Sequence, residues 1–212
     1  TVFKKYMGNR DEVVAKIETV ENSLNGPLYA EVIEFSSLKQ VLKSSQRISC
    51  RNLLLIYSLL ILSGRFETTK FTEIKSELLV EFEDMVHKAP DSRQKVVSLL
   101  FLSDHYHFNG DIELASKSIF HATSISYALG LHQTPSKLWT MLLFYDSMIC
   151  SIIGRPTSIH KAKGHDIQEL CEGFGAIAML VRDTNDVILE FQNKNWLSRV
   201  IDLDEKYNEM IQ

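Results

Sequence analysis

The chain has 212 residues, a formal net charge of −4 at pH 7, and a composition that is 45% hydrophobic and 24% charged. These values are typical of a folded globular protein and exclude collagen-like repeats and intrinsic disorder, and the length suits a single domain over residues 1–212. Binding to nucleic-acid backbones needs a clustered basic face. With an acidic balance, we expect no direct nucleic-acid binding by these residues.

Cysteine usage and hydropathy narrow the protein class further. Cys50, Cys150 and Cys171 lie far apart and none has the C-x2-C spacing of a zinc site, so we expect buried, reduced thiols in an intracellular protein. The most apolar run, Leu53 to Gly64, is shorter than the ~20 residues that span a bilayer, so it predicts a core helix and no membrane contact. Because the chain begins at Thr1, we expect a piece of a longer protein.

Apolar residues recur at i, i+3, i+4 and i+7 along most of the chain, which predicts an all-α fold of eight or nine helices packed as antiparallel hairpins. The helix at 51–62 is apolar on nearly every side and should be the most buried. In chain order, turn signals place the helices at 10–24, 28–43, 51–62, 72–87, 93–108, 112–129, 135–153, 176–192 and 196–210.

Several helix ends are predicted from capping residues. Gly64 and Gly130 are placed to end their helices, and Asp91 or Ser92 can cap the helix at 93–108. Thr134 is the expected cap of the helix that follows Gly130, with Pro135 at its first helical position.

The hairpin at 95–128 carries a partial tetratricopeptide pattern. Two antiparallel helices need small residues where they touch and a glycine where the chain reverses. The matching positions are Ser103, Tyr106, Gly110, Ala115, Ile119 and Ala122. This hairpin predicts tetratricopeptide-like packing, but no second copy with comparable spacing is present, so we do not expect a repeat array.

Four neighbouring residues suggest a metal site at first sight: Asp104, His105, His107 and Asp111. On a helix, residues two apart point roughly 200° away from each other, so His105 and His107 cannot chelate one ion together. Core or rim histidines are the favoured interpretation, and we expect no metal site. The sequence also lacks G-x-S-x-G, a P-loop and G-x-G-x-x-G, so we expect no catalytic residues, no cofactor in this chain and no enzymatic activity.

Two other groups have a functional and a structural interpretation. Trp139, Phe144 and Tyr145 could line a ligand pocket, but aromatic residues at helical spacing favour the core. A small basic cluster could contact an anion or a partner, although a solvated loop is the favoured interpretation. It comprises His160, Lys161, Lys163 and His165.

Asp146 lies in a strongly apolar helix, seven residues after Trp139. A buried carboxylate must be paired or hydrogen-bonded to remain charged. The candidate partner in the sequence is Arg155, nine residues on, which can return toward the helix after the turn at Gly154 and pair with the carboxylate. The alternative is that Asp146 caps a neighbouring helix. No second acid or base stands nearby for catalysis.

Together these stretches resemble the middle homology, or regulatory, domain of fungal zinc-cluster transcription factors. The resemblance covers about 98–159 and rests on an ordered series of positions. These are Ala128, Gly130, Leu131 and His132, then Leu138, Trp139, Tyr145 and Asp146, and finally Gly154, Arg155, Pro156 and Ile159. Thr140 and Ser147 depart from the family pattern, and the part after Ile159 is expected to be divergent or shortened.

The resemblance implies a regulatory domain of a nuclear transcription factor that acts through protein partners, by self-association or contact with the transcription machinery, or through a small-molecule effector. It also implies that Gly130, Leu131, Trp139, Tyr145, Asp146, Gly154, Arg155 and Pro156 are structural. The family's zinc cluster, and with it DNA binding, would lie outside these residues. A helical-repeat interaction scaffold, such as a subunit of a chromatin or chromosomal complex, is the alternative.

Overall fold

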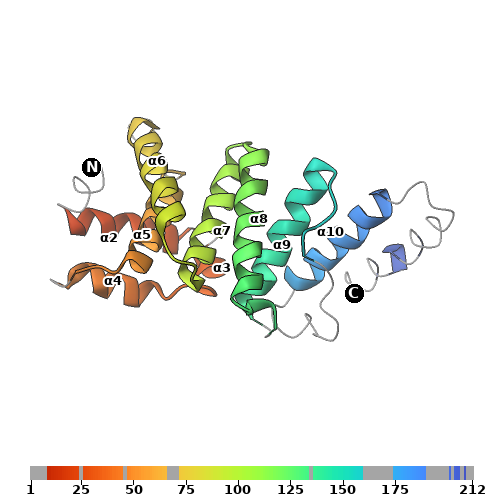
Figure 1. Ribbon diagram of the computed structural model, residues 1–212, viewed down its shortest axis with the longest axis horizontal. Coiled ribbons are helices and arrows are strands. Elements are labelled where there is room, and N and C mark those ends of the chain that lie inside the picture. The colour runs from red at the N-terminus through yellow and green to blue at the C-terminus, as the bar shows by residue number, and fades with distance from the viewer. Residues whose placement is uncertain are drawn as a thin grey trace. The chain divides into compact units, whose positions relative to one another are not determined.

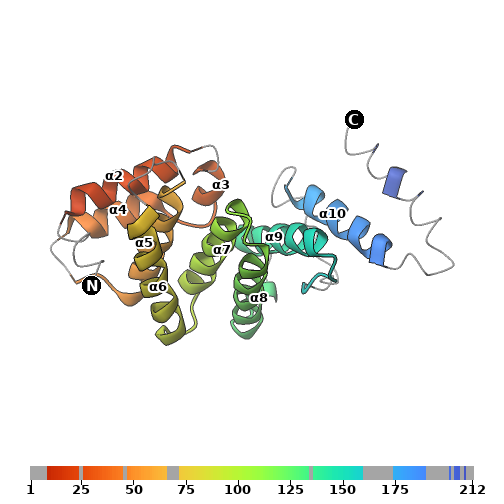
Figure 2. The same cartoon turned by 90° about the horizontal axis from the view of Figure 1, so that it is seen from above.

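The computed structural model contains only helices in the part of the chain that it describes (Figures 1 and 2). This confirms the all-α prediction. The described residues are 9–23, 26–44, 47–65, 72–133, 136–159 and 174–189, with 201, 203–205 and 208. The helix predicted at 196–210 and the basic cluster at 160–165 lie largely or wholly outside them. Within the described part, no helix is both long and apolar enough to cross a membrane.

The contacts between Cα atoms divide the chain into two compact units, 1–105 and 106–212, and the boundary falls in the last turn of α7. In the first unit, α2 packs against α3, α4 and α5, and α5 packs against α6. Its helices are α2 (Arg10–Glu21), α3 (Gly26–Ala30), α4 (Phe35–Lys43), α5 (Cys50–Ser63), α6 (Thr72–Lys88) and α7 (Arg93–Phe108). The single domain expected over 1–212 stays a prediction.

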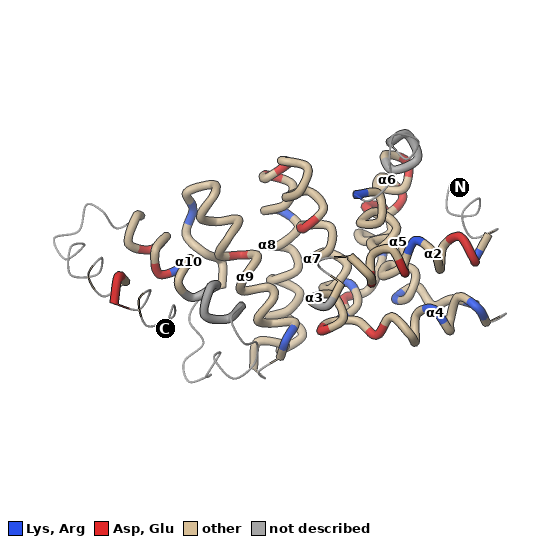
Figure 3. The backbone as a smooth tube through the Cα atoms, turned by 180° about the vertical axis from the view of Figure 1, so that it is seen from behind, with Lys and Arg blue, Asp and Glu red and all other residues tan. Residues whose placement is uncertain are grey.

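The second unit is built around α9 (Lys137–Ile153). This helix packs against α8 (Ile112–Ala128) and more extensively against α10 (Phe174–Leu189), while the short 3-10 helix η1 (Leu131–Gln133) packs against α8. Figure 3 shows α9 almost without charged positions, and Lys137 and Asp146 are its only Lys, Arg, Asp or Glu residues. The apolar character of α9 therefore explains why helices cover it on more than one side.

Helix α5 is buried along most of its length, but the prediction that it is the most buried helix is wrong, because α7 is buried without interruption from Lys95 to Tyr106. All ten residues from Leu54 to Ser63 are buried, and burial of each large aliphatic side chain contributes about 1.5–3 kcal/mol. Ser49 begins the helix by accepting a hydrogen bond from the backbone N–H of Asn52 (3.2 Å). Gly64 follows its last residue, in the predicted place.

The helix predicted at 28–43 is wrong in one respect, because the chain breaks it into α3 and α4. Glu34, just before α4, is in an extended conformation. In an unbroken helix, Tyr29, Val32 and Ile33 would face roughly 140° away from Phe35, Leu38 and Leu42. All six side chains are buried. The break therefore allows two opposite apolar faces to reach the same core.

Helices α7 and α9 end in the same hydrogen-bonded motif. At the end of α7, Gly110 has φ +82°, and the N–H groups of Gly110 and Asp111 bond to the carbonyls of His107 and Tyr106. At the end of α9, Gly154 has φ +63°, and the N–H groups of Gly154 and Arg155 bond to the carbonyls of Ser151 and Cys150. This is the Schellman arrangement, in which a left-handed glycine satisfies the last carbonyls of a helix. Both turns lie where the sequence predicts them.

Helix α9 begins at Lys137, slightly later than the predicted start at residue 135. Ser136 caps the helix, because its side chain accepts a hydrogen bond from the N–H of Trp139 (3.2 Å), and the first helical residue is Lys137. The predicted cap and first residue, Thr134 and Pro135, lie outside the described residues. Either a serine or a threonine can act as an N-cap, so the sequence offers two candidates within three positions.

The start of α7 agrees with one of its two predicted caps. The Ser92 side chain accepts a hydrogen bond from the backbone N–H of Lys95 (3.2 Å). The carboxylate of Asp91 instead accepts one from the Lys95 ammonium group (3.1 Å). Ser92 is therefore the N-cap of this helix.

Candidate functional site

The carboxylate of Asp146 is completely buried and is held by three neutral donors from the same unit. Its Oδ1 accepts hydrogen bonds from the Ser158 hydroxyl (2.5 Å) and the Cys150 thiol (3.7 Å), and its Oδ2 accepts one from the backbone N–H of Ile159 (3.0 Å). Burial raises the pKa of Asp146, against the opposing effect of these hydrogen bonds. The carboxylate thus ties α9 to the turn that follows it.

The expected ion pair between Asp146 and Arg155 is absent from the described residues. Arg155 is exposed to solvent, and its backbone carbonyl accepts a hydrogen bond from the Asn185 side chain of α10 (2.8 Å). After the glycine turn, the chain presents its backbone and Ser158 to the carboxylate, while the charged end of Arg155 remains hydrated. The alternative of a capping role is closer to the structure, although the N–H that Asp146 binds belongs to a turn.

Cys150 belongs to the same cluster. Burial, and then the nearby carboxylate of Asp146, raise the pKa of the Cys150 thiol to about 12. The thiol is therefore protonated at neutral pH and is available as a hydrogen-bond donor to Asp146. A protonated, buried thiol is a poor nucleophile, so this arrangement favours a structural role for Cys150.

The other motif residues of the family-like stretch surround the start of α9. Gly130 has φ +70°, which allows the chain to turn between α8 and η1. The Trp139 ring packs edge-on against Tyr127 (centroids 5.4 Å apart) and near His132 (6.1 Å). Leu131 begins η1. These contacts give Gly130, Leu131 and Trp139 a shared place at the junction of α8 and α9.

The aromatic residues that could have lined a ligand pocket belong mainly to the core. Trp139 and Tyr145 are buried, and the rings of Phe144 and Tyr145 meet edge-on with centroids 5.5 Å apart. Ring contacts of this kind contribute about 0.5–1.5 kcal/mol beyond area burial. The core interpretation of these three side chains therefore fits the structure better than the pocket.

The four residues that suggest a metal site in the sequence have other surroundings. Asp104 forms an ion pair with Arg65, and His105 is buried. His107 is partly exposed and Asp111 is exposed. Among the described residues, no group of three or more His, Cys, Asp or Glu side chains could hold a metal ion.

A buried polar cluster in the first unit was not predicted from the sequence. Nη1 of Arg65 lies 2.9 Å from Oδ2 of Asp104, and both side chains are less than a tenth exposed. The hydroxyl of Tyr29 donates to the same oxygen, and Nη2 of Arg65 donates to the backbone carbonyl of Asp104. The cluster links α3, the end of α5 and α7. In the sequence, the only indication of this cluster is the position of Arg65, a cation directly after the buried helix α5.

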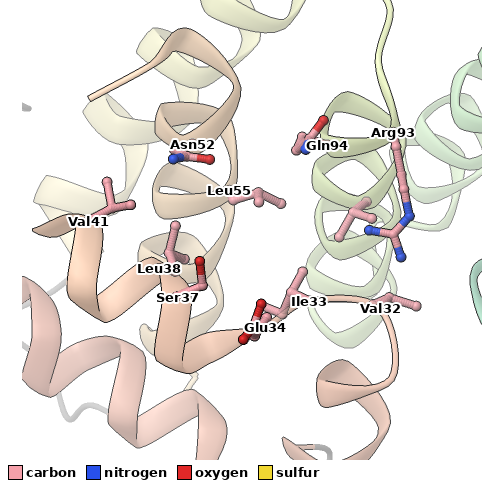
Figure 4. Close-up of a pocket in the computed structure, with 11 residues that line it drawn as sticks. Val32, Ile33, Glu34, Ser37, Leu38, Val41, Asn52, Leu55, Arg93 and Gln94 are labelled. Carbon is pink, nitrogen blue, oxygen red and sulfur yellow. The ribbon is translucent and has the colours of Figure 1, made fainter. Parts of the chain in front are cut away.

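The first unit also contains a cavity of about 190 Å³ between α4, α5, α7 and the segment at 31–34 (Figure 4). Its apolar wall includes Ile33, Leu38, Leu55 and Val97. The sequence does not indicate this cavity, because helical periodicity continues through the break at Glu34 that shapes one side of it.

The structure describes an all-α protein that includes the buried carboxylates of Asp104 and Asp146 and a small cavity in the first unit. No family model, curated protein or solved structure matches the chain.

Proposed function

We propose that this chain is a regulatory or effector domain of a nuclear fungal transcription factor, which controls transcription through protein contacts or a small ligand. The observation that carries the proposal is the ordered series of family-like residues from Ala128 to Ile159. DNA binding and its zinc cluster would be encoded outside these residues.

The geometry supports this proposal because the family-like residues meet in two junctions. Gly130 and Trp139 lie where α8 gives way to α9, and Asp146 and Gly154 fix the turn after α9. If the family-like residues have a structural role, they should lie where helices pack against each other or against a turn, and these residues do. Tyr145, between the two junctions, is buried as well.

The proposal is tested by fusing residues 1–212 to a heterologous DNA-binding domain and measuring a reporter gene in yeast nuclei. We expect the fusion to raise or lower transcription relative to the DNA-binding domain alone. The Asp146→Ala variant, which removes the link between α9 and its turn, should lose the effect, whereas the exposed Arg155→Ala variant should keep it. An expressed, nuclear fusion with no effect on the reporter would argue against a regulatory domain.

The full coding sequence provides an independent test. Six cysteines that begin with C-x2-C-x6-C spacing in the flanking sequence would support the proposal, because such a cluster holds two zinc ions for DNA recognition. Their absence, together with an inactive reporter fusion, would contradict it.

The second candidate is a helical-repeat interaction scaffold, for example in a chromatin or chromosomal complex. One observation favours it: consecutive helices of the second unit pack in chain order, α8 on α9 and α9 on α10, as they do in stacked helical repeats. Ile152 and Ile188 are exposed apolar side chains of this unit. Further hairpins of 34-residue period in the full coding sequence, with an inactive reporter fusion, would favour this candidate over the first.

A further inference from the structure

The cavity in the first unit is too small for most drug-sized ligands but large enough for one compact molecule. Its volume is about 190 Å³, whereas pockets for larger ligands usually measure about 300–1,000 Å³. An engineered cavity of about 150 Å³ accommodates benzene. The cavity therefore suits a ligand with a body of roughly five or six carbon atoms.

The wall of the cavity combines apolar and polar side chains (Figure 4). Leu38 and Leu55 come from α4 and α5, Val97 comes from α7, and Ile33 comes from the break between α3 and α4. These side chains provide an apolar surface for an aliphatic group. In Figure 4, Asn52 of α5 and Gln94 of α7 point toward the space between the two helices, where their carboxamides can donate and accept hydrogen bonds.

Two opposite charges, Glu34 and Arg93, also line the cavity. Both residues are exposed, and neither forms an ion pair within the described part of the chain. Glu34 accepts one long hydrogen bond, from the Ser36 hydroxyl (3.4 Å). Arg93 is the first residue of α7, where the helix dipole adds positive potential. A ligand would therefore place its anionic end toward α7 and its cationic end toward Glu34.

We propose that this cavity binds a small aliphatic zwitterion of the amino-acid class. The aliphatic body contacts Leu55, Val97 and their apolar neighbours, the carboxylate binds Arg93, and the ammonium group binds Glu34. The biological role of such a ligand, as an effector of transcription, rests on the proposed function, whereas the binding itself does not.

The test is calorimetric titration of the purified chain with two zwitterions that differ in charge spacing, L-leucine and 6-aminohexanoate. Hexanoate and hexylamine, which each carry one of the two charges, are the matched controls. We expect at least one zwitterion to bind with a dissociation constant in the micromolar to millimolar range, about twofold to fivefold more tightly than either control, because each control can pair with only one of the two exposed charges.

Variants of the two charged residues locate the binding site. Glu34→Gln and Arg93→Gln should each weaken zwitterion binding by about twofold to fivefold. Arg51→Gln, an exposed cation on α5 outside the cavity, and Glu113→Gln, an exposed carboxylate on α8, should leave it unchanged. Circular dichroism would verify that all four variants are folded.

Three results would overturn the proposal: no zwitterion binding at about 10 mM, equal binding of hexanoate or hexylamine, or unchanged binding in both cavity variants. The reporter experiment distinguishes this failure from failure of the proposed function. An active reporter without zwitterion binding would leave regulation through protein contacts, and zwitterion binding with an inactive reporter would leave the cavity without a transcriptional role.

Discussion

Asp104 in α7 and Asp146 in α9 are both buried carboxylates, but their surroundings differ in kind. Asp104 is paired with the Arg65 guanidinium and also accepts a hydrogen bond from Tyr29. Asp146 has no cation among the described residues and is held by a hydroxyl, a thiol and a backbone N–H. The negative charge of Asp104 is compensated by a buried cation. Asp146 is stabilised only by neutral hydrogen-bond donors, and its burial favours the protonated form.

The two surroundings predict different effects of substitution on stability. A buried ion pair repays its desolvation only while both partners remain, so removal of one leaves the other charged and buried. Replacement of a carboxylate that binds only neutral donors leaves no unpaired charge, so its cost is that of the donors left without an acceptor. The first unit should therefore be sensitive to charge, and the second mainly to the loss of acceptors.

The largest expected effect is at Asp104. Replacement by alanine leaves Arg65 buried without its carboxylate, so we expect Asp104→Ala to lower the free energy of unfolding by about 3–5 kcal/mol, as measured by urea denaturation. The control is Asp84→Ala, which removes the exposed pair with Lys88 and should cost about 1 kcal/mol or less. An equal loss of unfolding free energy in the two variants would show that the buried ion pair stabilises the protein no more than the exposed one.

A smaller effect is expected at Asp146. At pH 7, Asp146→Ala leaves the buried N–H of Ile159 without an acceptor and should cost about 1–3 kcal/mol. Asp146→Asn should cost less than Asp146→Ala, because its carboxamide oxygen can accept from Ile159 and its NH2 group can donate to the Ser158 oxygen, while only the weak Cys150 thiol donor loses its acceptor. Urea denaturation of both variants tests this order, and an asparagine variant as unstable as the alanine variant would contradict the neutral-donor description.

The raised pKa of Asp146 makes the contribution of this residue to stability depend on pH. Because the pKa of Asp146 is raised on folding from its usual 3.8, the folded state binds this proton more tightly than the unfolded state does. The resulting stability is fully present below pH 3.8 and is lost as the pH rises through the folded pKa. In the Asp146→Asn variant, the carboxamide at this position cannot titrate.

The stability of the wild type relative to Asp146→Asn should therefore fall as the pH rises from 3.8 through the raised pKa of Asp146. Urea denaturation of the two proteins at a series of pH values measures this difference. A difference that stays constant or grows would contradict the raised pKa. The comparison cancels the titration of groups that both proteins share.

The smallest effect is expected at Arg155. Its side chain is exposed and does not pair with Asp146, so Arg155→Ala should change the free energy of unfolding by no more than about 0.5 kcal/mol. Combined with Asp146→Asn, the two changes should add to within about 0.5 kcal/mol. A coupling energy above about 1 kcal/mol in this double-mutant cycle would show that Arg155 and Asp146 do interact.

Much of the fold could be predicted because helical periodicity and turn residues are local signals. The buried face of α2 at Val13, Val14, Ile17 and Val20 and the turns at Gly110 and Gly154 follow from a few neighbouring residues. The break at Glu34 could not be found in this way, because both of its flanks have helical periodicity and only the shared core requires the chain to bend.

The hydrogen-bond and ion-pair partners of the buried charged residues were harder to predict than the burial of those residues. The apolar neighbours of Asp146 indicated a buried carboxylate, but its donors are a serine, a cysteine and a backbone N–H, which are too common in any sequence to single out. Arg65 and Asp104 are 39 positions apart, and no local pattern links them. For the cavity, Glu34 and Arg93 are 59 positions apart, and no local pattern in the sequence places both of them at one cavity.

The bond from Ile159 to Asp146 gives this turn a built-in reporter. Ile159 is buried and lies outside the helices, and its N–H is bonded to a carboxylate instead of a backbone carbonyl. Its amide hydrogen can exchange with solvent only when that bond opens. The exchange rate of this one amide would therefore measure how often the turn after α9 separates from the helix, without any substitution in the chain.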